Sequence, residues 1–136
     1  MSTATHAPWT EAVRRFIDDP ARFATIVTLA EDGTPCQAVV WYAVRDDGVL
    51  INSRLGRRWP ANLRRDPRIS LAVEDAYDYV VVRGRADVVA TGDAALLDIQ
   101  ALARRYGADP GAFAGQARIS FLVRPAVIGT HGRVAA

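Results

Sequence analysis

The possible fold is constrained most by a succession of short β-branched segments separated by tight turns. Residues 23–29 read FATIVTL, and the turn 31–34 leads from them into a second apolar segment, residues 35–44. A second turn, residues 46–48, leads into the apolar segment 49–52. Turns containing Asp-Gly between such segments are typical of β-hairpins. The first half of the chain therefore predicts antiparallel strands joined by hairpins.

The second half adds three longer strand-like segments, residues 68–74, 77–90 and 117–129. Gly84 interrupts the middle one, which predicts a bulge or bend, because glycine inside a strand often marks one. Six strands of mostly antiparallel character indicate a mainly β (α+β) fold, a small closed or split barrel. No repeat or interdomain linker divides the chain, so residues 1–136 are expected to form one domain.

Helices are predicted at only a few crossings between these strands. Thr10 can cap a first, amphipathic helix with its hydroxyl. Pro60 suits the first turn of a short second helix, where its missing N–H would have no partner. Asp93 can cap a third helix over residues 94–106, and Gly107 is expected to end it.

Composition excludes several classes of protein. Half of the residues are apolar, but no apolar run approaches a membrane span, and the N-terminal residues lack the features of a secretory signal. Cys36 is the single cysteine, so an intramolecular disulfide is ruled out and a reducing cytoplasm is expected. The net charge of +2 is too small to imply general nucleic-acid binding. We therefore expect a cytoplasmic protein without nucleic-acid or membrane partners.

All 17 basic residues are arginine, and five of them follow the strand that ends in Asn52 and Ser53. Small polar side chains, arginine forks and helix N–H groups that converge on one corner form an anion site, most naturally for phosphate. The competing interpretation is a solvated basic loop, which charge runs usually form. The five residues are Arg54, Arg57, Arg58, Arg64 and Arg65.

The chain offers little acid–base machinery of its own. Its two histidines, His6 and His131, and its one cysteine exclude the ligand spacing of a zinc site. The sequence contains no Gly-x-Ser-x-Gly elbow, no Gly-x-Gly-x-x-Gly loop and no Walker A loop. No metal and no catalytic side chain is assigned, and a bound cofactor is expected to supply the reactivity of any enzyme built on this chain.

Taken in order, these segments resemble the pyridoxamine 5'-phosphate oxidase-like flavin-binding split barrels, over about residues 10–130. The segment NLRRDPR (residues 62–68) and the strand VWYAV (residues 40–44) look most like the branch that uses the deazaflavin coenzyme F420. The resemblance implies a six-stranded antiparallel split β-barrel with a few peripheral helices. It also implies a homodimer, with the cofactor in a groove at the interface.

The resemblance further implies which residues bind the cofactor. Its phosphate would meet the end of the third strand and the basic segment after it, at Asn52, Ser53, Arg54, Arg57, Arg58 and Asn62. Trp59 stands where many relatives have a lysine. Either Arg57 and Arg58 supply the positive charge instead, or Trp59 stacks on the cofactor. The alternative interpretation of Trp59 is that it packs in the core. The ring system would meet Gln37, Val39 and Trp41, which share one face of a strand, and the aromatic pair Tyr77 and Tyr79.

The activity implied is an oxidoreductase that transfers a hydride between F420 and a small, conjugated, electron-poor acceptor. F420 carries an acidic lactyl-oligoglutamate tail beyond its phosphate, and the surplus of arginines favours it over FMN. An FMN-binding oxidoreductase of the same fold, or a non-enzymatic flavin or F420 carrier, are the alternatives. Haem, which commonly takes an axial histidine, fits poorly because the chain has only two histidines.

Overall fold

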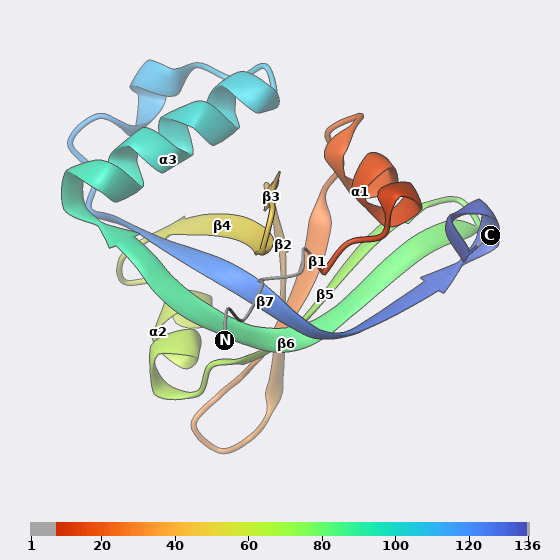
Figure 1. The fold of residues 1–136 in the computed structure, drawn as a ribbon. Helices are drawn as coiled ribbons and strands as arrows, with labels where there is room; N and C mark the ends of the chain where they lie inside the picture. Colours follow the sequence, from red (N-terminus) through yellow and green to blue (C-terminus); the bar gives the residue numbers. More distant parts are fainter. Residues whose placement is uncertain (1–7, 136) are drawn as a thin grey trace, which may run out of the picture.

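The computed structural model describes residues 8–135. Its seven strands form one sheet in the order β2-β1-β5-β6-β7-β4-β3, and every neighbouring pair is antiparallel. The long strands β6 and β7 run together as a curved pair, with α3 above one end and α1 above the other (Figure 1). The elements are α1 (Glu11–Asp18), β1 (Ala24–Leu29), β2 (Pro35–Val40), β3 (Ala43–Arg45), β4 (Gly48–Arg54), α2 (Arg58–Arg65), β5 (Arg68–Asp75), β6 (Asp78–Thr91), α3 (Gly92–Arg105), η1 (Pro110–Phe113), β7 (Arg118–His131) and η2 (Gly132–Ala135).

The mainly β (α+β) class is confirmed, but the expected strand number was wrong, because residues 35–44 form two strands instead of one. The Tyr42 backbone leaves the ladder: its N–H donates to Tyr106 Oη (3.1 Å) and its carbonyl accepts from Arg105 Nε (3.0 Å). On either side of Tyr42 the chain pairs with different strands, β2 with β1 and β3 with β4. These strands are the two edges of the sheet, so the barrel is split at this point.

Both faces of β4 are buried, one in the hydrophobic core and the other where α3 packs against β4 and β7. Val49 and Ile51 of β4 belong to the core, together with Phe121 of β7. Leu50 points to the other side of β4 and is also buried, because side chains alternate along a strand and α3 packs against β4 and β7. β4 is therefore apolar on both faces, which explains its continuous hydrophobic run.

Local sequence signals set most of the helix ends and the main bulge. Thr10 caps α1 through a hydrogen bond from Val13 N–H to its Oγ1 (3.2 Å), as predicted. Gly107, with φ of +70°, follows the end of α3 as expected. The prediction that Asp93 caps α3 was wrong, because the helix already begins at Gly92, with φ of +59°, and Asp93 lies inside its first turn. The register shift at Gly84 confirms the predicted bulge, and a Cβ there would overlap the Arg124 carbonyl.

Within the described part of the chain, no helix combines the length and apolar character that a membrane crossing requires.

Candidate functional site

A cavity of about 380 Å³ lies at the end of β4, within the size range of small-molecule sites. Seven of the twelve predicted cofactor residues line it: Val39, Trp41, Asn52, Ser53, Arg54, Arg57 and Trp59. Four further residues complete the lining: Val40, Ile99, Phe113 and Arg118. The basic segment and the predicted ring-binding strand therefore meet at one cavity.

The split in the barrel determines where this cavity forms. Its walls come from both β2 and β4, which lie toward opposite ends of the strand order. The end of β4 pairs with the beginning of β7, and this register sets Arg54 opposite Arg118. The excursion between β6 and β7, which contains α3 and η1, contributes Ile99 and Phe113 to the lining. Segments distant in sequence thus converge on the predicted anion-binding corner.

Arg118 is the charged residue of the cavity lining that the sequence analysis did not single out. Its side chain is buried, with Nε donating to Asn52 Oδ1 (2.9 Å) and Nη1 to Gln116 Oε1 (2.8 Å), and its guanidinium lies 5.2 Å from the centre of the Phe113 ring. Burial lowers the pKa of Arg118, and the nearby charges of Arg57 and Arg54 lower it further. A signal was available, because Arg118 directly precedes residues 119–123, which are apolar except for Ser120.

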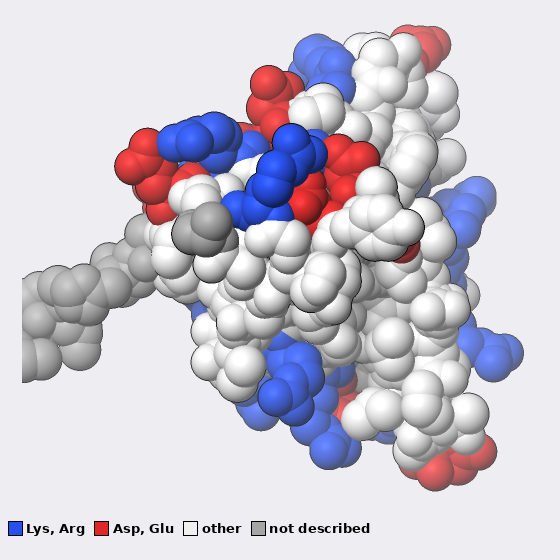
Figure 2. Space-filling model, turned by 90° about the vertical axis from the view of Figure 1, so that its right-hand side faces the viewer, with Lys and Arg blue, Asp and Glu red and all other residues white. Residues whose placement is uncertain are grey.

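The arginines of the cavity have no acidic partner, unlike eight arginines elsewhere on the described chain that form ion pairs. Arg124 forms ion pairs with Asp87 (2.6 Å) and Asp47 (2.9 Å), and other arginines behave similarly. Figure 2 shows this mixing of basic and acidic side chains over the upper part of the face that carries α1. Among the described residues, Arg54, Arg57 and Arg118 form no such pair, and no carboxylate lines the cavity. The cavity is therefore positively charged and suited to an anion.

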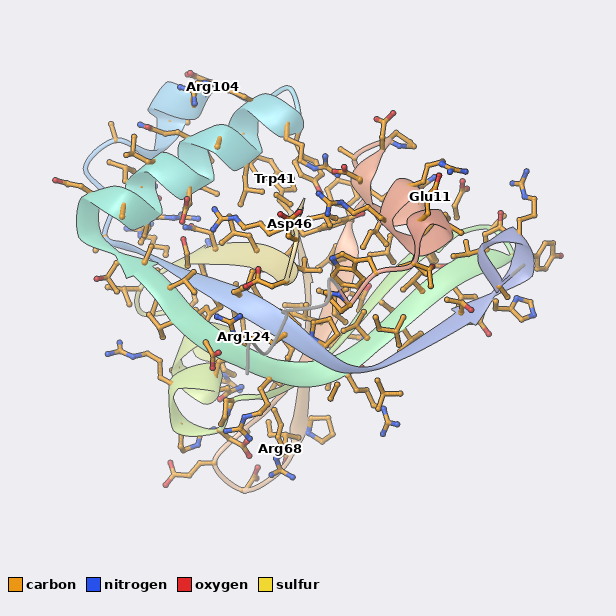
Figure 3. The ribbon with its side chains drawn as sticks, viewed as in Figure 1. Glu11, Trp41, Asp46, Arg68, Arg104 and Arg124 are labelled. Carbon is orange, nitrogen blue, oxygen red and sulfur yellow. The ribbon has the colours of Figure 1, made fainter. Side chains whose placement is uncertain are left out.

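Trp41 gives the cavity an aromatic wall. Its ring stacks on Tyr106, with centroids 5.1 Å apart and planes 8° from parallel, and Phe113 meets it edge-on at 6.2 Å. Figure 3 shows Trp41 beneath the C-terminal end of α3. Tyr42, the next residue, points the other way and is fully buried, with its hydroxyl donating to the Ile17 carbonyl (2.6 Å). Of this aromatic pair, only Trp41 borders the cavity.

Trp59 and Asn62 both contribute to packing. Trp59 lines the cavity but is only 9 % exposed, and its ring lies 5.8 Å from that of Phe121 in the core. Asn62 lies in α2 and donates from Nδ2 to Thr28 Oγ1 (3.0 Å), which joins α2 to β1 outside the cavity. Arg58 opens α2 as an exposed side chain that does not reach the cavity lining.

The remaining predicted residues lie away from the cavity of the same chain. Gln37 is on the exposed face of the edge strand β2, the face that also carries Val39. Tyr77 is 85 % exposed, and Tyr79 stacks on His131 with ring centroids 4.9 Å apart. Tyr79 and His131 lie at the opposite end of the β6–β7 ladder from Arg118, so one chain does not bring the tyrosines to the cavity.

Comparison with known proteins agrees with this architecture. The family model for pyridoxamine 5'-phosphate oxidase matches residues 9–131. The chain belongs to this family. Its split barrel is the fold that the sequence resemblance implied. A search of the curated proteins found no match.

Solved structures show the same fold as this pyridoxamine 5'-phosphate oxidase family member. One described as an F420 reductase is 24 % identical with a TM-score of 0.76, over 89 % of this chain and 98 % of that one. A conserved hypothetical protein from Mycobacterium tuberculosis is 23 % identical with a TM-score of 0.78, over 96 % and 89 %. The heme storage protein HutZ from Vibrio cholerae is 16 % identical with a TM-score of 0.69, over 82 % and 87 %. At these identities the likeness concerns the fold alone.

Proposed function

We propose that this family member is an oxidoreductase that binds coenzyme F420 and transfers a hydride between it and a small, conjugated, electron-poor acceptor. The observation that carries the proposal is the cavity at the end of β4, where three arginines without acidic partners lie beside the aromatic wall of Trp41. This combination suits a ligand with a phosphate at one end and a planar ring system at the other.

The residues of the cavity fit such a cofactor. Arg54 and Arg57 are exposed at the rim, where their guanidinium groups would bind the phosphate and the acidic tail of F420. Val39 and Trp41 offer apolar and aromatic surface for the ring. FMN, which has a phosphate but no acidic tail, needs fewer positive charges, so the arginine surplus favours F420.

The bound deazaflavin would supply the hydride, and the protein would supply position and charge. The described lining of the cavity contains no carboxyl, imidazole or phenol group that could act as a strong acid. A proton for the reduced product is therefore expected from water. Trp41 and Phe113 would shield the bound ring from solvent on the side of α3.

We further propose that the working site needs a second copy of the chain. Val39 is 66 % exposed at the cavity, and it lies on an edge strand whose outer face nothing covers among the described residues. A single chain would leave the ring partly in solvent. A homodimer would cover this face, in keeping with the interface groove that the sequence resemblance implies.

Titration of the purified protein with F420 and with FMN, followed by fluorescence, tests the cofactor. We expect F420 to bind more tightly and its affinity to fall as salt is added, because contacts at an exposed rim are screened. FMN affinity equal to or above that of F420 would instead support an FMN-binding oxidoreductase. Oxidation of reduced F420 by electron-poor acceptors, in the presence of catalytic amounts of protein, separates an enzyme from a carrier; tight binding without turnover would support the carrier.

Haem sequestration is a less suitable function for this cavity. His131 makes a 2.8 Å hydrogen-bond contact through Nδ1 with the Tyr77 carbonyl and lies at the far end of β7. It is therefore not placed to provide an axial ligand at the cavity of its own chain. His6, the other histidine, lies outside the described residues.

A further inference from the structure

Asn52 was expected to contact the cofactor, but its amide group is already occupied. Nδ2 donates one hydrogen bond to the Ala95 carbonyl (2.9 Å) and one to Ser120 Oγ (2.8 Å). An amide nitrogen has two hydrogens, so its donor capacity is used in full. Oδ1 accepts from Arg118 Nε, and the residue is only 8 % exposed. Asn52 therefore holds Arg118 and has little left to offer a ligand.

The hydrogen bonds around Asn52 continue to the protein surface. Ser120 receives the bond from Asn52 and donates from Oγ to Asp98 Oδ2 (2.7 Å). The other oxygen of Asp98 accepts from Arg45 Nη2 (3.4 Å). Because Asp98 is anchored at both oxygens, the orientation of Ser120 and then of the Asn52 amide is fixed. This series determines which part of the Arg118 guanidinium faces the cavity.

The Nη2 group of Arg118 is the part without a protein partner. Nε and Nη1 bond to Asn52 and Gln116, whereas no hydrogen bond from Nη2 is found among the described residues. Those residues also include no fully buried side-chain nitrogen or oxygen without a partner. Nη2 therefore keeps accessible surface, and the cavity is the open space that Arg118 lines. Arg118, a residue only 8 % exposed, thus presents hydrogen-bond donors to a ligand.

We infer that Arg118 binds the phosphate of the cofactor from the floor of the cavity, positioned by Asn52 through Ser120 and Asp98, while Arg54 and Arg57 bind it and the tail from the rim. This inference rests on the proposed function in one respect, that the ligand is a phosphorylated flavin or deazaflavin. The buried contact from Arg118 and the exposed contacts from Arg54 and Arg57 should differ in their response to salt. Screening acts strongly on exposed charges and weakly on buried ones.

Replacing Arg118 by Met keeps the length and the apolar stem of the side chain and removes its donors. We compare FMN, F420 and riboflavin, which has the FMN ring and ribityl chain without phosphate. Arg118→Met should weaken the binding of FMN and of F420 by about tenfold to a hundredfold, the range for losing one charge-assisted contact. The affinity for riboflavin should change less than about twofold. Arg104→Met, at an exposed position of α3 away from the cavity, is the matched control and should change none of the three.

Ser120→Ala tests the positioning role, because it removes the hydroxyl that joins Asn52 to Asp98. It should lower the ratio of FMN affinity to riboflavin affinity in the same direction as Arg118→Met, but less. A purely structural effect would weaken both ligands alike and leave the ratio unchanged. The salt dependence of FMN binding should remain in Arg118→Met and decrease in Arg57→Ala.

If the parent protein binds F420 more tightly than FMN but Arg118→Met keeps the parental FMN-to-riboflavin ratio, the inference about Arg118 is overturned and the proposed function stands. If the parent binds neither cofactor, the proposed function fails, and titration with pyrophosphate by calorimetry tests Arg118 alone. Pyrophosphate binding that disappears in Arg118→Met would then support the floor site. Pyrophosphate binding that persists in that variant, or is absent from the parent, would overturn it.

Discussion

Tyr42 lies where the chain passes from β2 to β3, and Tyr42→Phe tests how that split is held. The hydroxyl is fully buried and donates to the Ile17 carbonyl at 2.6 Å. Without it, that carbonyl keeps only a 3.5 Å contact from Arg105 Nη2. Leaving a buried acceptor so weakly bonded should lower the free energy of unfolding by about 1–2 kcal/mol at neutral pH.

The same hydroxyl makes the stability of the parent protein depend on alkaline pH. Burial, helped by Tyr106 and opposed by Arg105, raises the pKa of Tyr42 from 10.0 to about 12. Below pH 10 the phenol is protonated in both states and its contribution is complete. Between pH 10 and 12 the unfolded chain loses this proton first, so the free energy of unfolding falls. At about 1.4 kcal/mol per pKa unit, the loss reaches about 2 kcal/mol near pH 12.

Tyr42→Phe lacks this ionisable group, so the unfolding free energies of the two proteins should converge in alkali and cross at about pH 11–12. Urea denaturation at closely spaced pH values from 8 to 12 measures both curves. Tyr77→Phe, at a side chain that is 85 % exposed, is the control for general alkaline loss and should match the parent at neutral pH. Parallel curves for Tyr42→Phe and the parent over the whole range would refute the reasoning.

Three other expectations follow from the site and the sheet. Arg57→Ala should weaken cofactor binding about tenfold to a hundredfold in fluorescence titrations and leave the melting temperature of the apo protein nearly unchanged, with Arg57→Lys recovering part of the loss; unchanged binding would misplace the phosphate corner. Light scattering at micromolar concentration should give about twice the 14.8 kDa chain mass, and a strict monomer that binds cofactor tightly would contradict the dimer. Gly84→Ala should cost about 1–3 kcal/mol by chemical denaturation, because its Cβ would overlap the Arg124 backbone, whereas Gly129→Ala in the same ladder, with its nearest neighbour at 4.0 Å, should be tolerated; equal stability of the two variants would contradict the packing argument.

Most strands were predictable because their signals are local. The turn residues 31–34 and 46–48, the β-branched runs and Gly84 act over a few neighbours, and the structure places a hairpin or a bulge at each. The division of residues 35–44 was not predictable in this way. It depends on Tyr106 and Arg105, which lie 64 and 63 residues away from Tyr42 and supply the hydrogen bonds that the sheet does not. Periodicity alone shows one continuous strand there.

The residues of the candidate site likewise fall into those predictable from local sequence and those brought in by long-range strand pairing. Asn52, Ser53, Arg54 and Arg57 are close in sequence, and a strand that runs into a short helix was enough to group them at one corner. Arg118 is 66 residues from Asn52 and reaches the corner only through the pairing of β4 with β7. The register between two distant strands cannot be predicted from either strand segment alone. The distinction between Asn52 as a ligand and Asn52 as a support likewise needed the positions of Ala95 and Ser120.

The split and the cavity have a common structural cause in the excursion between β6 and β7. A backbone that leaves a sheet must find other partners for its N–H and carbonyl groups. At Tyr42 these partners are Tyr106 and Arg105, at the end of α3. The chain that continues from α3 then brings Phe113 against Trp41 and delivers Arg118 to β7. The segment that stabilises the open edge of the barrel therefore also provides one wall and the buried cation of the cavity.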